Sequence, residues 1–345
     1  MYVRHELGQF HALNKNLPLM VTGRDPFPHC VEIHPTDFCN QACSYCFHGG
    51  VGEDVSRRGE MLSVAEYRDL IDELVDAGVS EVSVSGGGEP MFYLGIGEVL
   101  GHIARSPLDL RLVTNANVIP DDAVPALMDA AEVRVSIDSV NSDVYNKQRG
   151  MRGGNLLDRT LKNLRMLAAT REQTGGQVRI ACTFLVSELN QTEIEQFAAV
   201  LIDDVGVDTV VYKQDIYGRI TFEDAEVRHR LDQVHRDYGD RVEIRVEDIV
   251  DEIGGPCGVA YSKVAFNPYG ELYSCCLGSQ PGEKNGSLFG SLRAAGSFRK
   301  LWQNSADNRR SMLFGGVSCQ DCNHTDRLIN VTVRAELDRA ASLPS

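Results

Sequence analysis

The chain has 345 residues, of which 43% are hydrophobic, enough to bury the core of one large and one small domain. Its 34 basic and 49 acidic residues give a formal net charge of -15, which argues against nucleic acid or an anionic membrane as a partner. The segment through Gly23 has no apolar run near the length of a signal or membrane helix, so we expect a cytoplasmic protein.

The first recognisable element follows an irregular N-terminal extension, residues 1–28, which is too short for a separate peptide-binding module and so favours a small-molecule substrate. Val31 to His34 alternates apolar and polar residues and predicts a short strand, the first of a barrel. We expect a site at the carboxyl end of this strand.

Three thiols follow this strand within eight residues, at Cys39, Cys43 and Cys46. Three thiolates on one short loop can hold three corners of a [4Fe-4S] cube and leave the fourth iron open, whereas a structural metal normally takes four protein ligands. The alternatives are buried small hydrophobes or a zinc site in which His48 is the fourth ligand.

A strand-helix repeat begins after this loop. Ser63 and Glu66 form a predicted capping box for a helix that ends at Gly78. Residues 81–85 are expected to form the next strand, which runs into the sequence Gly-Gly-Gly-Glu-Pro at residues 86–90. Glycines there let the backbone approach a ligand closely, and the glutamate supplies a fixed anion.

The repeat continues along the chain. We predict strands at Leu110–Thr114, Val133–Asp138, Val178–Leu185 and Thr209–Lys213. The helices between them include Leu156–Ala169 and one after Asn190, where Thr192 and Glu195 form another predicted capping box. Repeated units of this kind imply parallel strands with ligands at their carboxyl ends. Six units make an α/β fold, a partial TIM-like barrel.

The repeat is expected to end near residue 225, where a charged helix, a short strand at 242–246 and a second cysteine group follow. A hairpin turn is predicted at residues 267–270. The cysteines that could close a site with four ligands are Cys257, Cys275, Cys319 and Cys322, and Cys276 could exchange with Cys275. Spacing alone leaves a zinc ribbon as the alternative.

The three-thiol loop, with Tyr45 just before its last cysteine, resembles the radical S-adenosylmethionine (SAM) enzymes, and residues 87–90 resemble that family's GGEP motif. The resemblance implies a (β/α)6 barrel and a cluster whose open iron binds SAM. It also implies cleavage to a 5'-deoxyadenosyl radical, with an electron donor such as flavodoxin or ferredoxin. The SAM contacts that it implies are Tyr45, Gly87, Gly88, Glu89, Ser136, Asp138 and Arg149.

The second cysteine group resembles the twitch domain, a shortened relative of the SPASM domain, and this implies one auxiliary [4Fe-4S] cluster and two clusters in all. The expected domains are therefore an extension at 1–28, a radical SAM core at 29–225 and a twitch domain at 226–345.

The reaction is predicted from Cys182, near the end of the fifth strand. A free cysteine is usually a small buried hydrophobe and the parity of this strand is ambiguous, but relatives often place a polar site residue eight positions before an asparagine in the next loop, where Asn190 stands. We therefore expect Cys182 to point into the barrel. A thiol can return a hydrogen atom to a carbon radical, so the prediction is an epimerase of a sugar, aminoglycoside or nucleoside-type molecule, similar to twitch epimerases of antibiotic biosynthesis. The alternatives are a dehydrogenase, a decarboxylase and, outside enzymes, a two-cluster electron carrier. A carrier would need neither an open iron nor a large barrel.

Overall fold

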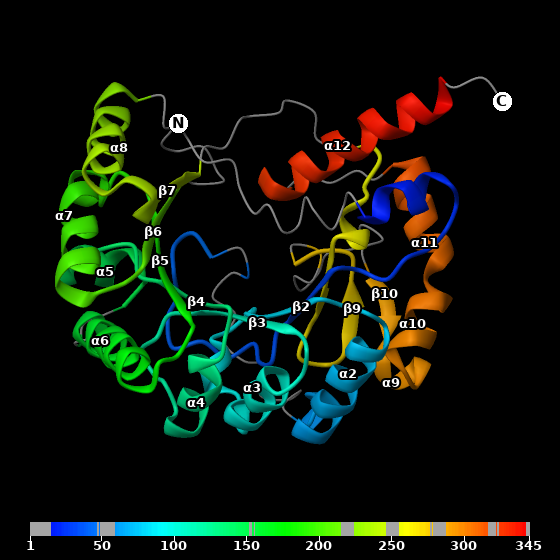
Figure 1. Ribbon diagram of the computed structural model, residues 1–345, viewed down its shortest axis with the longest axis horizontal. Helices are drawn as coiled ribbons and strands as arrows, with labels where there is room; N and C mark the ends of the chain where they lie inside the picture. The colour runs from blue at the N-terminus through cyan, green and yellow to red at the C-terminus, as the bar shows by residue number, and fades with distance from the viewer. Residues whose placement is uncertain are drawn as a thin grey trace.

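A curved sheet of ten strands runs through the described parts of the chain, in the order β10-β9-β8-β1-β2-β3-β4-β5-β6-β7 (Figure 1). The computed structural model describes residues 15–46, 48, 59–151, 154, 156–214, 224–245, 255–276, 278, 288–316, 322 and 324–342. No helix within these ranges is long and apolar enough to cross a membrane.

The central part of this sheet is parallel. Its strands are β1 (Cys30–Ile33), β2 (Glu81–Val84), β3 (Asp109–Thr114), β4 (Glu132–Ser136), β5 (Arg179–Leu185), β6 (Thr209–Lys213) and β7 (Val242–Arg245). Each strand pairs in parallel with the next, as the predicted repeat requires. The sheet is not closed, so the fold is a partial barrel.

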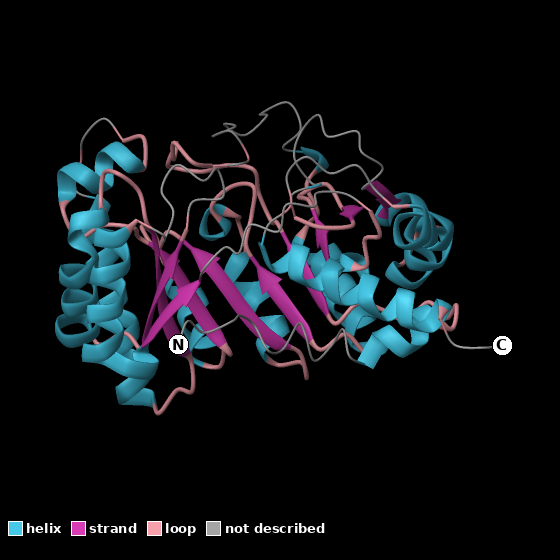
Figure 2. Ribbon diagram, turned by 90° about the horizontal axis from the view of Figure 1, so that it is seen from above, coloured by secondary structure: helices cyan, strands magenta, loops and turns pink. Residues whose placement is uncertain are grey.

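The helices cover the convex side of this sheet (Figures 1 and 2). They are α2 (Val64–Asp76), α3 (Ile96–Ala104), α4 (Val124–Met128), α5 (Ser142–Gln148), α6 (Leu156–Thr174), α7 (Ile194–Ala198) and α8 (Ala225–Tyr238). The capping box of Ser63 and Glu66 is confirmed at the start of α2. The second predicted box is wrong, because α7 begins after Glu193 without a side-chain cap and Glu195 instead pairs with Arg230.

The repeat is longer than the sequence predicts. Helix α8 is followed by β7, and Val210 of β6 is in register with Val242 of β7. The segment after residue 225 therefore begins by adding a seventh parallel strand to the sheet. The sequence predicts the short strand at this place. It does not predict that α8 and β7 together continue the barrel, because α8 is a charged helix.

The remaining strands extend the opposite edge. Strand β8 (Lys263–Phe266) pairs in parallel with β1, and β9 (Glu271–Tyr273) and β10 (Leu288–Ser291) follow it in antiparallel order. The predicted hairpin turn at 267–270 is confirmed between β8 and β9, with Gly270 at φ +77°. The β9–β10 pairing is irregular, with a register shift between Leu288 and Gly290. Helices α9 (Leu292–Ala295), α10 (Phe298–Asn304), α11 (Ala306–Arg310) and α12 (His324–Ala341) complete the described chain.

Alternation along the strands gives the sheet two different faces. On β5, Ile180 and Phe184 belong to the hydrophobic core, and the Phe184 ring lies 4.5 Å from that of Phe197 on α7. The residues of opposite parity, Ala181 and Thr183, face the concave side. The helix-facing side is thus apolar, while charged residues stand on the concave side of several strands.

Glu132 on β4 shows how those charges are balanced. Its side chain is only 4% exposed, and Arg134, Arg179 and Arg111 lie 2.7, 3.2 and 3.7 Å from its carboxylate oxygens. A single buried anion therefore links three neighbouring strands across the sheet.

We expect Glu132→Gln to lower the free energy of unfolding by about 3 kcal/mol, because it leaves partly buried arginines without their anion. Urea denaturation of the cofactor-free chain measures this change. The control is Glu226→Gln, since Glu226 pairs with Arg230 but is 72% exposed, and its loss should cost less than about 0.5 kcal/mol. Equal effects of the two substitutions would show that Glu132 and its arginines stabilise the sheet no more than an exposed ion pair does.

Candidate radical and iron-sulfur site

The cysteine loop after β1 is held by backbone hydrogen bonds on two sides. On one side the nitrogens of Gly88 and Glu89 donate to the carbonyls of Thr36 and Phe38 at 3.0 and 2.7 Å. On the other, the nitrogen of Ala42 donates to the carbonyl of Arg149 at 3.0 Å. A loop without regular structure thus acquires a fixed shape from the turn after β2 and the end of α5.

Two glycines make these contacts sterically possible. A Cβ atom at Gly88 would lie 2.2 Å from the Phe38 carbonyl oxygen, and one at Gly150 would lie 2.0 Å from that of Ala42. Gly150 also has a φ of +64°, which disfavours side chains. The predicted close approach of the glycine-rich turn is therefore an approach to the cysteine loop.

The three thiols of the loop are partly exposed at the carboxyl end of β1. Burial, and to a smaller extent the neighbouring charges of Glu89, Cys43 and Cys46, raise the pKa of Cys39 to about 12. Burial also raises the pKa of Cys43, against the opposing charge of Arg149. Such thiols ionise readily only when a cationic group binds them.

Three thiols on one loop are a donor set that fits an iron-sulfur cluster. Within the described ranges, no three His, Cys, Asp or Glu side chains gather closely enough to hold a single metal ion. Thiolates at the corners of a cube stand further apart than the ligands of one ion, and the three-thiol spacing leaves one iron open.

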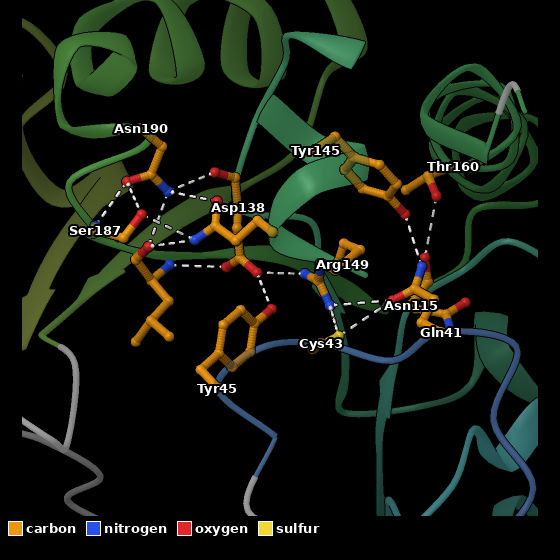
Figure 3. Close-up of polar contacts among 12 residues, drawn as sticks. Gln41, Cys43, Tyr45, Asn115, Asp138, Tyr145, Arg149, Thr160, Ser187 and Asn190 are labelled. Atoms are coloured by element: carbon orange, nitrogen blue, oxygen red, sulfur yellow. Dashed lines mark hydrogen bonds and ion pairs between the residues drawn. The ribbon is translucent and has the colours of Figure 1, made fainter. Parts of the chain in front are cut away.

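A buried ion pair lies beside the loop (Figure 3). The guanidinium of Arg149 is 2.6 Å from Asp138, and its Nη1 donates to the sulfur of Cys43 at 3.7 Å. The hydroxyl of Tyr45 also donates to Asp138. Three of the predicted SAM-contact residues therefore contact one another next to a predicted cluster ligand.

The backbone at Asp138 is held in an uncommon conformation. Its φ is +61°, in the left-handed region, and its carboxylate accepts from the nitrogen of Leu185 at 2.8 Å. The Asn190 side chain donates to the Asp138 carbonyl at 2.7 Å. Asn190 is fully buried and braces this turn, so the tips of β4 and β5 are fixed together.

A second polar network on the loop was not predicted from the sequence. The Gln41 side chain donates to Asn117 at 2.8 Å and to Tyr145 at 2.9 Å, while Asn117 donates to Thr160 at 2.7 Å. Asn115 donates to Asn40 of the loop at 2.8 Å. The available signal was the pair of asparagines at the end of the third predicted strand, where ligand-side residues are expected.

Glu89 has its hydrogen bonds within the protein. Its carboxylate accepts from Thr114 and from the nitrogens of Asn115 and Met91. Burial raises the pKa of Glu89 to about 7, against these hydrogen bonds. Glu89 thus ties β2 to β3, and its contact with SAM stays a prediction, as does that of Gly87. Ser136 lies on β4 beside Thr183 of β5, on the concave side.

The expectation that Cys182 points into the barrel is wrong. Cys182 is fully buried in the hydrophobic core, on the same face of β5 as Phe184, which packs against the helices. Burial raises its pKa well above the ordinary range. The neighbouring Thr183 faces the concave side and is 7% exposed, and its hydroxyl has no hydrogen-bond partner among the described residues.

Residues around the second cysteine group meet at the other end of β1. Lys263 at the start of β8 pairs with Asp326 of α12 at 2.8 Å, and both charges act on Cys276. Cys322 lies four residues before Asp326, and Cys257 precedes β8, with its nitrogen bound to the Met312 carbonyl. Cys275 accepts from the nitrogen of Gly278. Cys319 lies outside the described residues.

This chain is similar in sequence to known proteins. Mycofactocin maturase MftC of Mycolicibacterium smegmatis is 25% identical over 318 residues, covering 87% of this chain and 76% of MftC. The subtilosin biosynthesis protein AlbA of Bacillus subtilis is 25% identical over 267 residues, and this chain spans only 56% of AlbA.

The fold is shared with a solved structure, that of Streptococcus suis SuiB bound to S-adenosylmethionine. The TM-score is 0.59 at 16% identity, and the match covers 82% of this chain and 69% of SuiB. The model of the radical SAM superfamily matches residues 33–198, which include the cysteine loop, the glycine-rich turn and the Asp138–Arg149 pair. Residues 33–198 of this chain therefore belong to the radical SAM superfamily.

Proposed function

We propose that this chain is a radical SAM enzyme with two [4Fe-4S] clusters that oxidises a polar substrate. Superfamily membership implies SAM and one cluster. When bound, these groups would supply hydrogen abstraction by a 5'-deoxyadenosyl radical, and the second cluster would supply a one-electron acceptor. The observation that carries the proposal is the cysteine loop fixed between the glycine-rich turn and the end of α5.

The chain's own residues have separate tasks in this proposal. Cys39, Cys43 and Cys46 would hold the first cluster, and the backbone of residues 87–88 would border bound SAM. The Asp138 turn keeps the ends of β4 and β5 together beside that site. The concave side carries polar residues toward the substrate. The hydroxyl of Thr183, which has no hydrogen-bond partner among the described residues, favours a ligand with hydrogen-bonding groups.

An auxiliary cluster is supported by the way three segments are joined. The Lys263–Asp326 ion pair is almost fully buried, with side chains 11% and 2% exposed, and it brings together the segments that carry Cys257, Cys276 and Cys322. We propose that Cys257, Cys275, Cys319 and Cys322, with Cys276 as the alternative to Cys275, form the twitch site of a domain that spans residues 226–345 and includes the seventh strand.

Oxidation is favoured over epimerisation because the proposed thiol donor is on the wrong side of the sheet. Cys182 has Phe184 and the core beside it, so it offers no hydrogen atom to a radical on the concave side. A substrate that has lost a hydrogen atom becomes oxidised when it loses a proton and an electron. The proposal is therefore conversion of a secondary alcohol of a sugar or aminoglycoside-type molecule to a ketone, with an external reductant such as ferredoxin for the first cluster.

A peptide is the second candidate substrate. SuiB has also been solved bound to its precursor peptide SuiA, with a TM-score of 0.59 to this chain, and AlbA takes part in bacteriocin biosynthesis. Aminoglycosides, nucleoside sugars and short peptides, each incubated with SAM and dithionite, would distinguish the two. The expected result is 5'-deoxyadenosine formed in step with an aminoglycoside or sugar product that has lost two hydrogens. If the incubation is run in deuterium oxide, an isomerised product that carries deuterium would instead support an epimerase.

We expect anaerobically reconstituted protein to contain about eight irons per chain, since two cubes hold four irons each. Cys257→Ala should retain about half of this iron and still cleave SAM to 5'-deoxyadenosine under dithionite. Cys43→Ala should also lose about half of the iron but abolish cleavage. Zinc in the second group, or cleavage by Cys43→Ala equal to that of the parent chain, would contradict the assignment.

Adjacent substitutions on β5 test which face meets the ligands. Thr183→Val keeps the shape of the side chain and removes a hydroxyl that has no partner in the described part of the chain, so it should raise the free energy of unfolding by about 1 kcal/mol while slowing SAM cleavage about tenfold. Cys182→Ala empties a core position and should lower stability by about 1 kcal/mol with no change in cleavage rate.

Urea denaturation of the cofactor-free chain and the rate of 5'-deoxyadenosine formation measure the two properties. The opposite pattern, in which Cys182→Ala slows cleavage and Thr183→Val does not, would restore the thiol to the reaction.

A further inference from the structure

Arg149 is a buried cation fixed at the edge of the cysteine loop. It is 3% exposed and its guanidinium lies 5.7 Å from the ring centre of Tyr45 and 5.8 Å from that of Tyr145. Two aromatic faces and the carboxylate of Asp138 therefore leave it little freedom to reorient. A guanidinium stays protonated in proteins, so its charge is permanent.

One edge of this guanidinium faces the loop. Nη1 donates to the sulfur of Cys43 at 3.7 Å and to the side-chain oxygen of Gln41 at 3.3 Å. Gln41 is held through its nitrogen by Asn117 and Tyr145, which keeps its oxygen toward Arg149. The direction of the N–H group toward the sulfur is thus set by neighbours on α5 and after β3.

The position of Arg149 along the chain also links its guanidinium to the cysteine loop. Its carbonyl accepts from Ala42 at 3.0 Å, so the same residue holds the loop by its backbone and reaches the adjacent sulfur with its side chain. The next residue is Gly150, and a side chain at this position would clash with Ala42. The glycine therefore allows the two segments to stay in contact. A movement of the loop would therefore change the contact between the cation and the sulfur.

We propose that Arg149 is a positioning residue that sets the reduction potential of the first cluster through its hydrogen bond to the Cys43 sulfur, with Asp138 orienting the guanidinium. Hydrogen bonds to ligand sulfurs and nearby positive charge stabilise the reduced, more negative state of an iron-sulfur cluster. The inference rests on the proposed function in one respect, because it requires that Cys39, Cys43 and Cys46 hold the cluster.

The test is the midpoint potential of the first cluster, followed by electron paramagnetic resonance during a redox titration of the full chain. The signal is assigned by its loss in Cys39→Ala. Arg149→Gln, which removes the charge, should shift the midpoint to a more negative value. Arg149→Lys keeps a charge but loses the planar fork, so its shift should have the same sign and be smaller.

The matched control is Arg171→Gln on α6. Arg171 also pairs with a carboxylate, that of Asp208, but it lies at the opposite end of β5, where Asp208 accepts from the nitrogen of Ile180. Its substitution should leave the midpoint unchanged. An unchanged midpoint in Arg149→Gln would overturn the inference, whereas a parent chain that binds no cluster at residues 39–46 would overturn the proposed function itself.

Loss of folding in Arg149→Gln is detected by its iron content. If this variant holds no iron, the decision passes to Arg149→Lys, and a midpoint for Arg149→Lys equal to that of the parent chain would overturn the inference.

Discussion

The shape of the cysteine loop depends on backbone hydrogen bonds to two neighbours. Residues 39–46 include no regular strand or helix, and the loop's amides and carbonyls pair with the turn after β2 and with the end of α5. Both neighbours are brought there by the parallel sheet, whose strands end at one edge. The site is therefore a property of the whole barrel wall, because moving β2 or β4 would move the thiols.

The sheet separates two kinds of chemistry on its faces. The convex side carries the hydrophobic core under the helices, and the concave side carries ionic groups such as Glu132 with its arginines and the Lys263–Asp326 pair. Most of the folding free energy from apolar burial must come from one face alone. On the concave face, buried ion pairs hold the strands and the last helix together, so this face does not need apolar side chains for that purpose.

Much of this arrangement could be predicted from local sequence. The capping box of Ser63, the strand-helix order and the hairpin at 267–270 are short-range signals, and all three are confirmed. The cysteine spacing and the glycine-rich turn identified the site because each depends on a few neighbouring residues. The contact between Asp138 and Arg149 was expected only as two separate SAM contacts, since pairing across 11 residues depends on the path of α5.

Apart from the capping box of Thr192 and Glu195, which α7 does not form, the wrong predictions concern the face that Cys182 takes on its strand and the point where the repeat ends. On β5 every residue from Ile180 to Phe184 is buried, so alternation of polarity could not show which face Cys182 takes. Only packing of Phe184 against α7 decides it. The sequence does not predict that the seventh strand continues the repeat, because the helix before it, α8, has a largely charged surface. The apolar side of α8 is a narrow buried stripe of Val227, Leu231 and Val234.

The register shift between Leu288 and Gly290 has a bearing on how the protein behaves at high concentration. An open sheet exposes its outer strands, and a regular outer strand invites pairing with another molecule. Strand β10 has only four residues, and Gly290 sits at φ +138° within its irregular part. A short, kinked strand of this kind is a poor template for intermolecular β-sheet growth, so this end of the sheet resists aggregation by its geometry.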